Sequence, residues 1–194
     1  MSELSGKQVI DDASLIRRCL DGDEVCMRIL VERFQGIVFG LCHRMLGHRE
    51  DAKDVAQDVF LRVFRSLQKW DSSRPFKPWL LTIAANRCRT ALSKRRRVPV
   101  ATELQIHPAT GAADVESLGL SEELQLALGE LRDDYRICFV LFHKQELSCA
   151  EVAEIMQCPE GTVKTWLHRA RRKLADSLIR RGVVTDSGFE LHRI

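Results

Sequence analysis

The sequence predicts an all-α protein in which two small helical domains are joined by a flexible linker. Apolar residues recur at helical spacing along most of the 194 residues, and only 5 prolines and 11 glycines interrupt them. A turn-rich sandwich or barrel would need more of both residues, so the composition argues against one. A hydrophobic fraction of 45% beside 29% charged residues is typical of a globular chain and not of a disordered one.

Four helices are expected in the first domain, residues 10–97. A short helix over residues 14–20 ends at a turn-forming DGD tripeptide, and a longer helix follows until Gly47 ends it. The clearest apolar stripe runs over residues 50–69, with spacings that alternate between three and one. The fourth helix is expected to begin near Pro78, because proline suits the first turn of a helix.

A second domain is expected over residues 121–181. The helical periodicity fails over residues 98–120, which hold two of the five prolines, and this stretch is predicted to be the linker. Helical spacing resumes at Ser121, which is followed by two glutamates that suit the first turn of a helix. The sequence identifies no role for the tail, residues 182–194.

Charge and cysteine content exclude several classes of protein. A net charge of +3 does not by itself mark a nucleic-acid binder. Seven widely spaced cysteines without a CxxC pair fit neither a disulfide framework nor a zinc ribbon, and they predict a reducing, cytoplasmic compartment. No apolar run is long enough for membrane insertion, and the first residues lack the pattern of a secretory signal. No cofactor is expected.

The most specific local pattern is a helix-turn-helix over residues 147–174. Ser148 and Glu151 have the spacing of a capping box, and a CPEG tetrapeptide separates the first helix from the second. The second helix carries cations and is expected to enter the DNA major groove; the alternative is the charged face of a small bundle. Candidates for contact with bases and nearby phosphates are Glu160, Thr162, Lys164, Thr165 and His168, and candidates for the phosphate backbone are Arg169, Arg171, Arg172 and Lys173.

A second basic cluster, without an acidic residue, closes the first domain. Trp70, Phe76 and Trp79 precede it. Aromatic rings beside a basic surface suit exposed bases, which stack on the rings while the backbone follows the charge. Trp79 fits the core equally well, and the cations also fit a solvated helix end. The cluster consists of Arg87, Arg89, Lys94, Arg95, Arg96 and Arg97.

These segments, in this order, resemble the sigma-70 family of bacterial transcription initiation factors, and specifically its compact extracytoplasmic-function (ECF) group. The resemblance covers about residues 13–178. The start of region 2 resembles GDEVCMRILVERFQGIVFGLCHRMLGHREDAKDVAQDVFLRVFRSLQKW, and its promoter-melting end resembles PFKPWLLTIAANRCRTALSKRRR. Region 4 resembles LGELRDDYRICFVLFHKQELSCAEVAEIMQCPEGTVKTWLHRARRKL.

The resemblance implies a sigma factor that binds core RNA polymerase, reads a −35 element with region 4 and melts a −10 element with region 2. The implied partners are the β′ clamp helices and β flap of the polymerase, promoter DNA and an anti-sigma factor. The −35 residues would be the candidates on the second helix of the helix-turn-helix. The expected −10 residues, which would capture a flipped base, are Trp70, Phe76, Trp79, Asn86, Arg87, Arg95 and Arg96.

The polymerase contact is implied for the polar face of the helix over residues 50–69. Some of these residues stand four apart, so surface ion pairs are the alternative explanation for this face. The implied polymerase-binding residues are Asp54, Gln57, Asp58, Arg62 and Arg65.

Two rival classes of function are compared with the sequence. An autonomous helix-turn-helix regulator would carry a ligand pocket or phospho-acceptor in its first half, where this sequence has an aromatic and basic surface instead. An enzyme is not expected, because GxSxG, HExxH, Walker and GxGxxG motifs are absent. A zinc site could be imagined from four residues whose spacing matches no standard finger: His143, Cys149, Cys158 and His168.

Overall fold

The computed structural model describes residues 10–97 and 115–184, and all regular structure in these two ranges is helical, which confirms the all-α prediction. None of the described helices combines the length and the apolar character that crossing a membrane requires. The elements are α1 (Asp12–Leu20), α2 (Glu24–Leu46), α3 (Arg49–Ser66), the 3-10 turn η1 (Leu67–Lys69), α4 (Phe76–Arg97), α5 (Val115–Gly129), α6 (Asp133–His143), α7 (Cys149–Met156) and α8 (Glu160–Arg180).

Short-range sequence sets the ends of the first helices. The carboxylates of Asp11 and Asp23 cap α1 and α2, and each accepts a hydrogen bond from the backbone N–H three residues further on, at 2.9 and 3.1 Å. Gly47 ends α2, as predicted, in a left-handed conformation with a φ of 75°. A side chain there would strain the turn, whereas glycine adopts it freely.

Two helices begin earlier than the apolar spacing predicts. α4 starts at Phe76, so Pro78 lies inside its first turn, where the missing N–H has no intrahelical partner to lose. α5 starts at Val115, within the stretch predicted to be linker. Both prolines of this stretch precede Val115, so neither of them opposes the helix. The remainder of the predicted linker and the tail from residue 185 lie outside the described residues.

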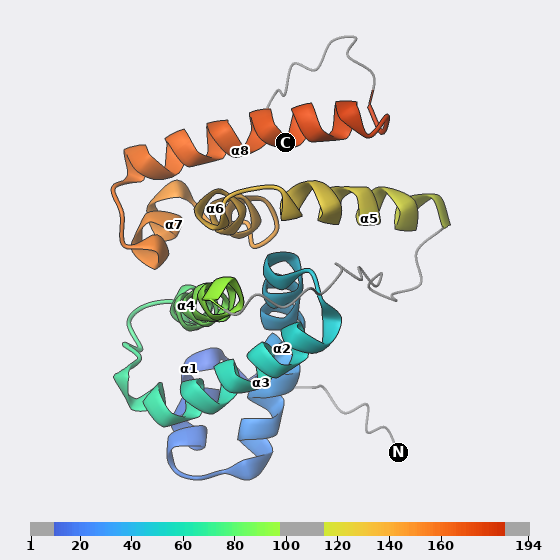
Figure 1. Cartoon of the computed structure of the whole chain (residues 1–194). Coiled ribbons are helices and arrows are strands. Elements are labelled where there is room, and N and C mark those ends of the chain that lie inside the picture. The colour runs from blue at the N-terminus through green and yellow to red at the C-terminus, as the bar shows by residue number, and fades with distance from the viewer. Residues whose placement is uncertain (1–9, 98–114, 185–194) are drawn as a thin grey trace, which may run out of the picture.

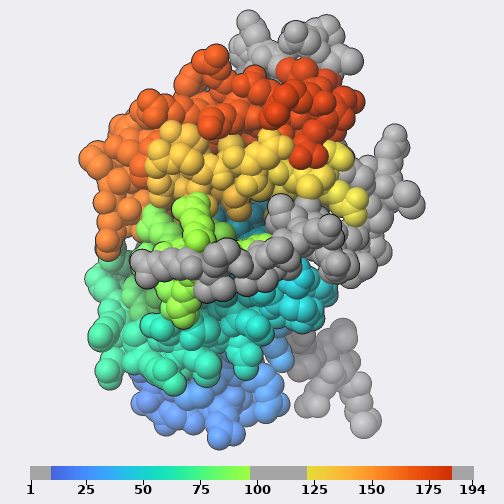
Figure 2. All heavy atoms as spheres, in the orientation of Figure 1, coloured from blue at the N-terminus to red at the C-terminus, as the bar shows by residue number. Residues whose placement is uncertain are grey.

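The helices form two layers that share one apolar core (Figure 1). α2 packs against α3 and α4 in the first half, and α6 packs against α7 and α8 in the second. Contacts of α4 with α7, and of α2 with α5 and α6, join the halves; we call these contacts the seam. Buried residues on both sides of the seam, such as Leu80 of α4 and Ile155 of α7, belong to the same cluster. The space-filling view shows the second half stacked directly on α4 (Figure 2).

One buried guanidinium joins helix ends across the seam. Arg136 of α6 is only 8% exposed, and it donates from Nη1 to the carbonyl of Met45 at 2.6 Å. Its Nη2 donates to the carbonyls of Gly129 at 2.7 Å and Leu131 at 3.0 Å. The carbonyls at a helix C-terminus have no partner within the helix, so Arg136 supplies donors to the ends of α2 and α5 together. Burial lowers the pKa of Arg136, but arginine stays charged.

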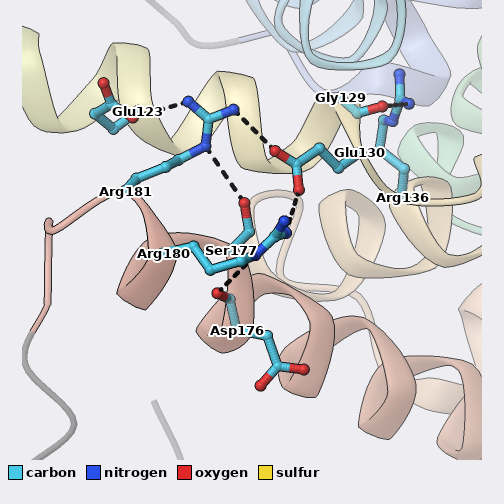
Figure 3. Close-up of polar contacts among 8 residues, drawn as sticks. All are labelled: Glu123, Gly129, Glu130, Arg136, Asp176, Ser177, Arg180 and Arg181. Carbon is cyan, nitrogen blue, oxygen red and sulfur yellow. Dashed lines mark hydrogen bonds and ion pairs between the residues drawn. The ribbon is translucent and has the colours of Figure 1, made fainter.

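Ion pairs fasten the end of α8 to α5 (Figure 3). Arg181 lies within 3.2 Å of Glu123 and 2.8 Å of Glu130, and Arg180 lies within 2.9 Å of Glu130. The hydrogen bond from Arg181 is the main cause of the lowered pKa of Glu130. These groups are largely exposed, so each pair contributes at most about 1 kcal/mol to stability.

Replacing Arg136 should destabilise the whole chain. Arg136→Met is expected to lower the free energy of unfolding by about 3 kcal/mol, because three carbonyls lose a charged donor in a buried place. Urea denaturation followed by circular dichroism measures this. The matched control is Arg172→Met on the exposed face of α8, with an expected change below about 0.5 kcal/mol. Equal losses in the two variants would contradict the role given to Arg136.

Candidate nucleic-acid interface

α7 and α8 form the predicted helix-turn-helix. The capping box is present: the backbone N–H of Glu151 donates to Ser148 Oγ at 3.2 Å, and the backbone N–H of Ser148 donates to Glu151 Oε2 at 2.8 Å. Gln157 ends α7 in a left-handed conformation with a φ of 52°. Val163 and Leu167 of α8 are buried against the rest of the domain. The opposite face of α8 is therefore turned outward.

The major-groove candidates gather on this outer face. Lys164 ion-pairs with Glu160 at 2.8 Å, and this contact raises the pKa of Lys164. A DNA phosphate approaching Lys164 would therefore replace a carboxylate that already neutralises it. Thr162 is half-buried, and the exposed candidates are Glu160, Lys164, Thr165, His168, Arg169 and Arg172.

Two arginines of α8 contact α6. Arg169 donates from Nη1 to the hydroxyl of Tyr135 at 3.2 Å while the rest of its side chain stays exposed. Arg171 is half-buried and donates to His143 at 3.4 Å, with its guanidinium 5.8 Å from the ring centre of Phe142. Arg171, one of the predicted phosphate-backbone residues, therefore packs along α6 on the flank of α8.

The predicted aromatic group comes together, but only two of its rings reach the surface. Phe76 is 2% exposed, with its ring 5.6 Å from that of Trp70, 5.5 Å from that of Trp79 and 5.1 Å from that of Phe34. Phe76 is thus too deeply buried here to stack on a base, and it supports the two tryptophans instead. Trp79, half-buried, combines the core role and the surface role that the sequence left open.

We call residues 70–75, between η1 and α4, the aromatic loop. A cavity of about 580 Å³ lies between this loop and α7. Trp70, Arg74 and Trp79 line it on one side, and Glu154 and Ile155 of α7 line the other. Arg74 ion-pairs with Glu154 across the cavity mouth at 2.7 Å. Sequence reasoning missed this contact, because it joins residues 80 apart and leaves no local signal.

Some cations of the predicted basic cluster form ion pairs, and some are exposed to solvent. Arg87 is half-buried and ion-pairs with Asp58, so it braces α4 against α3. Arg95 and Arg96 are exposed; Arg95 donates to a carbonyl at the end of α2 at 3.3 Å, and Arg96 ion-pairs with Asp133 of α6 at 2.8 Å. A long cationic surface thus exists at the end of α4, but the second half already holds part of it.

The polar face of α3 divides into two surfaces, and its last turns form a basic one. Arg62 and Arg65 line a cavity of about 420 Å³ together with Lys69 and Asn86. The structure therefore places two predicted polymerase residues beside a predicted −10 residue. Arg62 also pairs with Asp58 at 3.4 Å, so the alternative of a surface ion pair is observed for these two residues.

Residues 53–64 of α3 also form an apolar groove with α2, of about 670 Å³. Among the predicted polymerase residues, Gln57 lines this groove, and Asp54 is exposed on the same helix. Leu61 lies at its edge and is 50% exposed. The apolar lining consists of Val31, Phe39, Ala56, Phe60, Leu61 and Phe64. Sequence reasoning missed this groove, because it followed only the polar positions of α3.

The zinc alternative finds no support. Within residues 10–97 and 115–184, no three or more His, Cys, Asp or Glu side chains are grouped so that they could hold a metal ion. Cys149 and Cys158, two of the four residues considered, are free thiols.

Comparison with known proteins supplies a family. Residues 30–98 match the family model of Sigma-70 region 2, and residues 121–174 match that of Sigma-70, region 4. The chain is 33% identical over 176 residues to the ECF RNA polymerase sigma factor SigW of Bacillus subtilis (strain 168), covering 84% of this chain and 94% of SigW. It is 32% identical over 188 residues to the ECF RNA polymerase sigma-E factor of Escherichia coli (strain K12), covering 89% of this chain and 98% of that protein.

Solved structures agree with the fold. CnrH, in complex with the cytosolic domain of CnrY, aligns with a TM-score of 0.65 and 25% identity, over 87% of this chain and 97% of CnrH. The sigma factor RpoE in complex with the anti-sigma factor NepR from Bartonella quintana aligns with a TM-score of 0.66 and 24% identity. That alignment covers 78% of this chain and 95% of RpoE.

Reversing one charge at the cavity mouth should weaken the seam. Arg74→Glu or Glu154→Arg alone is expected to lower the free energy of unfolding by about 1 kcal/mol, because each leaves two like charges facing one another. The double variant, with the charges exchanged, should recover most of this loss in urea denaturation. Asp176→Arg, an exposed change on α8, is the control and should not rescue Arg74→Glu. If neither single change lowers the free energy of unfolding, the pair does not stabilise the contact between α7 and the loop.

Proposed function

Because the chain belongs to the ECF group of the sigma-70 family of RNA polymerase sigma factors, we propose that each surface described above has a separate task in promoter recognition. The chain directs promoter-specific initiation, and catalysis belongs to the polymerase. The observation that carries the proposal is the exposed basic face of α8 within the segment that matches region 4. The same chain also carries an aromatic and basic surface, within the segment that matches region 2.

The outer face of α8 is proposed to read the −35 element. A helix of this kind lies in the major groove with its first residues nearest the bases, which assigns base contacts to Lys164 and Thr165. Arg169 and Arg172 lie further along the same exposed face and suit the phosphate backbone. Lys164, once released from Glu160, can donate to the acceptors on guanine that face the major groove.

The aromatic loop and the start of α4 are proposed to hold the −10 element. Trp70 and Trp79 line the region 2 side of the cavity, and they can contact a base that has left the duplex once α7 has moved away. The basic cavity of Arg62, Arg65, Lys69 and Asn86 suits the backbone of the same single strand. Phe76 supports the rings from beneath.

The apolar groove between α2 and α3 is proposed as the docking surface for the β′ clamp helices. A helix in a groove buries its apolar face there and meets polar side chains at the rim. Leu61 and Phe64 offer apolar area, and Gln57 offers a polar rim. Asp58 and Arg62 are already paired with each other, so they are weaker candidates than Gln57 for this contact. A contact of the second half with the β flap stays a prediction.

An anti-sigma factor is a further proposed partner. RpoE of Bartonella quintana was solved with the anti-sigma factor NepR, and CnrH with the cytosolic domain of CnrY. Residues of both halves line the cavity between the aromatic loop and α7, so a partner bound there would contact both halves. We also assign the chain to the cytoplasm, where its polymerase acts.

Reading both promoter elements requires the seam to open. DNA patches about two helical turns apart are roughly 70 Å apart, at about 34–36 Å per turn. In the structure α7 packs on α4, and Glu154 of α7 ion-pairs with Arg74 of the loop proposed to hold the −10 element. The two halves must therefore move apart before both surfaces contact one promoter.

Transcription from a promoter library with purified core polymerase tests the proposal. Transcripts that start at defined sites only when the chain is present are expected. Lys164→Ala should reduce these transcripts about tenfold and leave binding to core polymerase unchanged. Lys144→Ala, at an exposed lysine outside α8, is the control. A chain that binds duplex DNA but not core polymerase would be an autonomous regulator, and the proposal would fail.

The groove between α2 and α3 can be tested separately. Leu61→Glu should weaken binding to core polymerase about tenfold or more, since it places a charge where apolar area is buried. Leu20→Glu is the matched control, because Leu20 is 52% exposed and lies at the end of α1, away from the groove. Fluorescence anisotropy of labelled chain gives both affinities. If the two variants bind core polymerase equally well, the groove is not the docking surface.

A further inference from the structure

The single tyrosine of the chain lies where α6 packs against α8. Tyr135, in the first turn of α6, is 5% exposed and its ring centre is 6.4 Å from that of Trp166 on α8. The other buried residues of this small cluster are apolar: Ala127, Leu128, Leu131, Ala170 and Leu174. Packing among such neighbours needs the ring but has no use for its hydroxyl group.

Three cations surround this ring. Arg169 donates to the hydroxyl at 3.2 Å, the guanidinium carbon of Arg132 lies 5.1 Å from the ring centre, and Lys173 Nζ lies 6.0 Å from it. The hydrogen bond from Arg169 is the main cause of the lowered pKa of Tyr135. Among the described residues, the only carboxylate paired with any of the three cations is Asp134, at 2.9 Å from Arg132. The group therefore carries an excess of positive charge beside an exposed helix face.

The contact with Tyr135 restrains a residue of the outer face of α8. An exposed arginine has many rotamers, and fixing it on a phosphate costs conformational entropy. Tyr135 uses one of the five N–H donors of Arg169 and leaves the others for an anion. Since the hydroxyl oxygen is the acceptor in this bond, its proton is also left to donate. The contact with Tyr135 thus reduces the conformational entropy that Arg169 loses when DNA binds.

We propose that Tyr135 is a positioning residue for DNA binding, which holds Arg169 and Lys173 so that they meet a backbone phosphate of the −35 element. The proposal rests on the function proposed for α8 and deepens it: the helix before the helix-turn-helix contributes to affinity through the side chains it restrains. The effect is independent of sequence, because phosphate contacts position a protein without reading bases.

Binding to a 20-base-pair duplex of arbitrary sequence, measured by anisotropy over a series of KCl concentrations, tests the proposal on the full chain. Tyr135→Phe keeps the ring and removes the hydroxyl. It is expected to weaken binding about fivefold. Arg169→Ala should also lower the slope of log affinity against log salt by about 0.9, the value for one lost phosphate contact. Tyr135→Phe keeps the charge of Arg169, so it should lower this slope by less.

The double variant separates positioning from packing. If Tyr135 acts through Arg169, adding Tyr135→Phe to Arg169→Ala should weaken DNA binding no further. Losses of affinity that add in the double variant, or unchanged binding in Tyr135→Phe, would overturn the proposal. Thermal unfolding of Tyr135→Phe is expected to match that of the unaltered chain.

A spectroscopic measurement gives a second readout. Since Tyr135 is the only tyrosine, 13C-labelled tyrosine places one reporter in the chain. Its ring signal should shift when the duplex is added to the unaltered chain, and should not shift in Arg169→Ala. Neither measurement uses polymerase, so a chain that fails to direct transcription would overturn the proposed function and leave this inference standing.

Discussion

The arrangement of the two halves depends on the hydrogen bonds that the carbonyls at the ends of α2 and α5 accept. α2 and α5 both terminate at the seam, and a buried carbonyl without a donor costs as much as a lost hydrogen bond. Arg136 satisfies carbonyls of both helices from a position that is 8% exposed. Because a single side chain serves both ends, the halves are held in one relative orientation, and the positions of α7 and α8 follow from it.

That orientation leaves one proposed DNA-binding surface free and covers another. The outer face of α8 is exposed along its length, whereas the aromatic loop faces α7 across a cavity bridged by Arg74 and Glu154. The groove between α2 and α3 lies away from the seam and is open to solvent. The surfaces proposed for duplex DNA and for a helical partner are therefore accessible in this structure, whereas the surface proposed for unpaired bases becomes fully accessible only when the halves part.

Local features were predictable from sequence, and features that depend on the seam were not. The capping box of Ser148 and the left-handed Gly47 involve residues close in sequence, so residue type and spacing were enough. The resemblance to the sigma-70 family supplied residue sets, but not which of their members pair with each other. Asp58 and Arg87 were assigned to different partners, yet they ion-pair between α3 and α4. Neither the burial of Phe76 nor that of Arg136 has a signal in periodicity, because both follow from how distant helices cross.

The polar contacts of the seam have an evolutionary consequence. Lys77 donates to the carbonyl of Gln145, Gln125 to that of His43, and Arg136 to that of Met45. In each case the acceptor is main chain, which is the same whatever residue occupies the position. Substitutions at positions 43, 45 and 145 thus leave these acceptors in place, and the two halves can diverge in sequence without paired, compensating changes across these bonds.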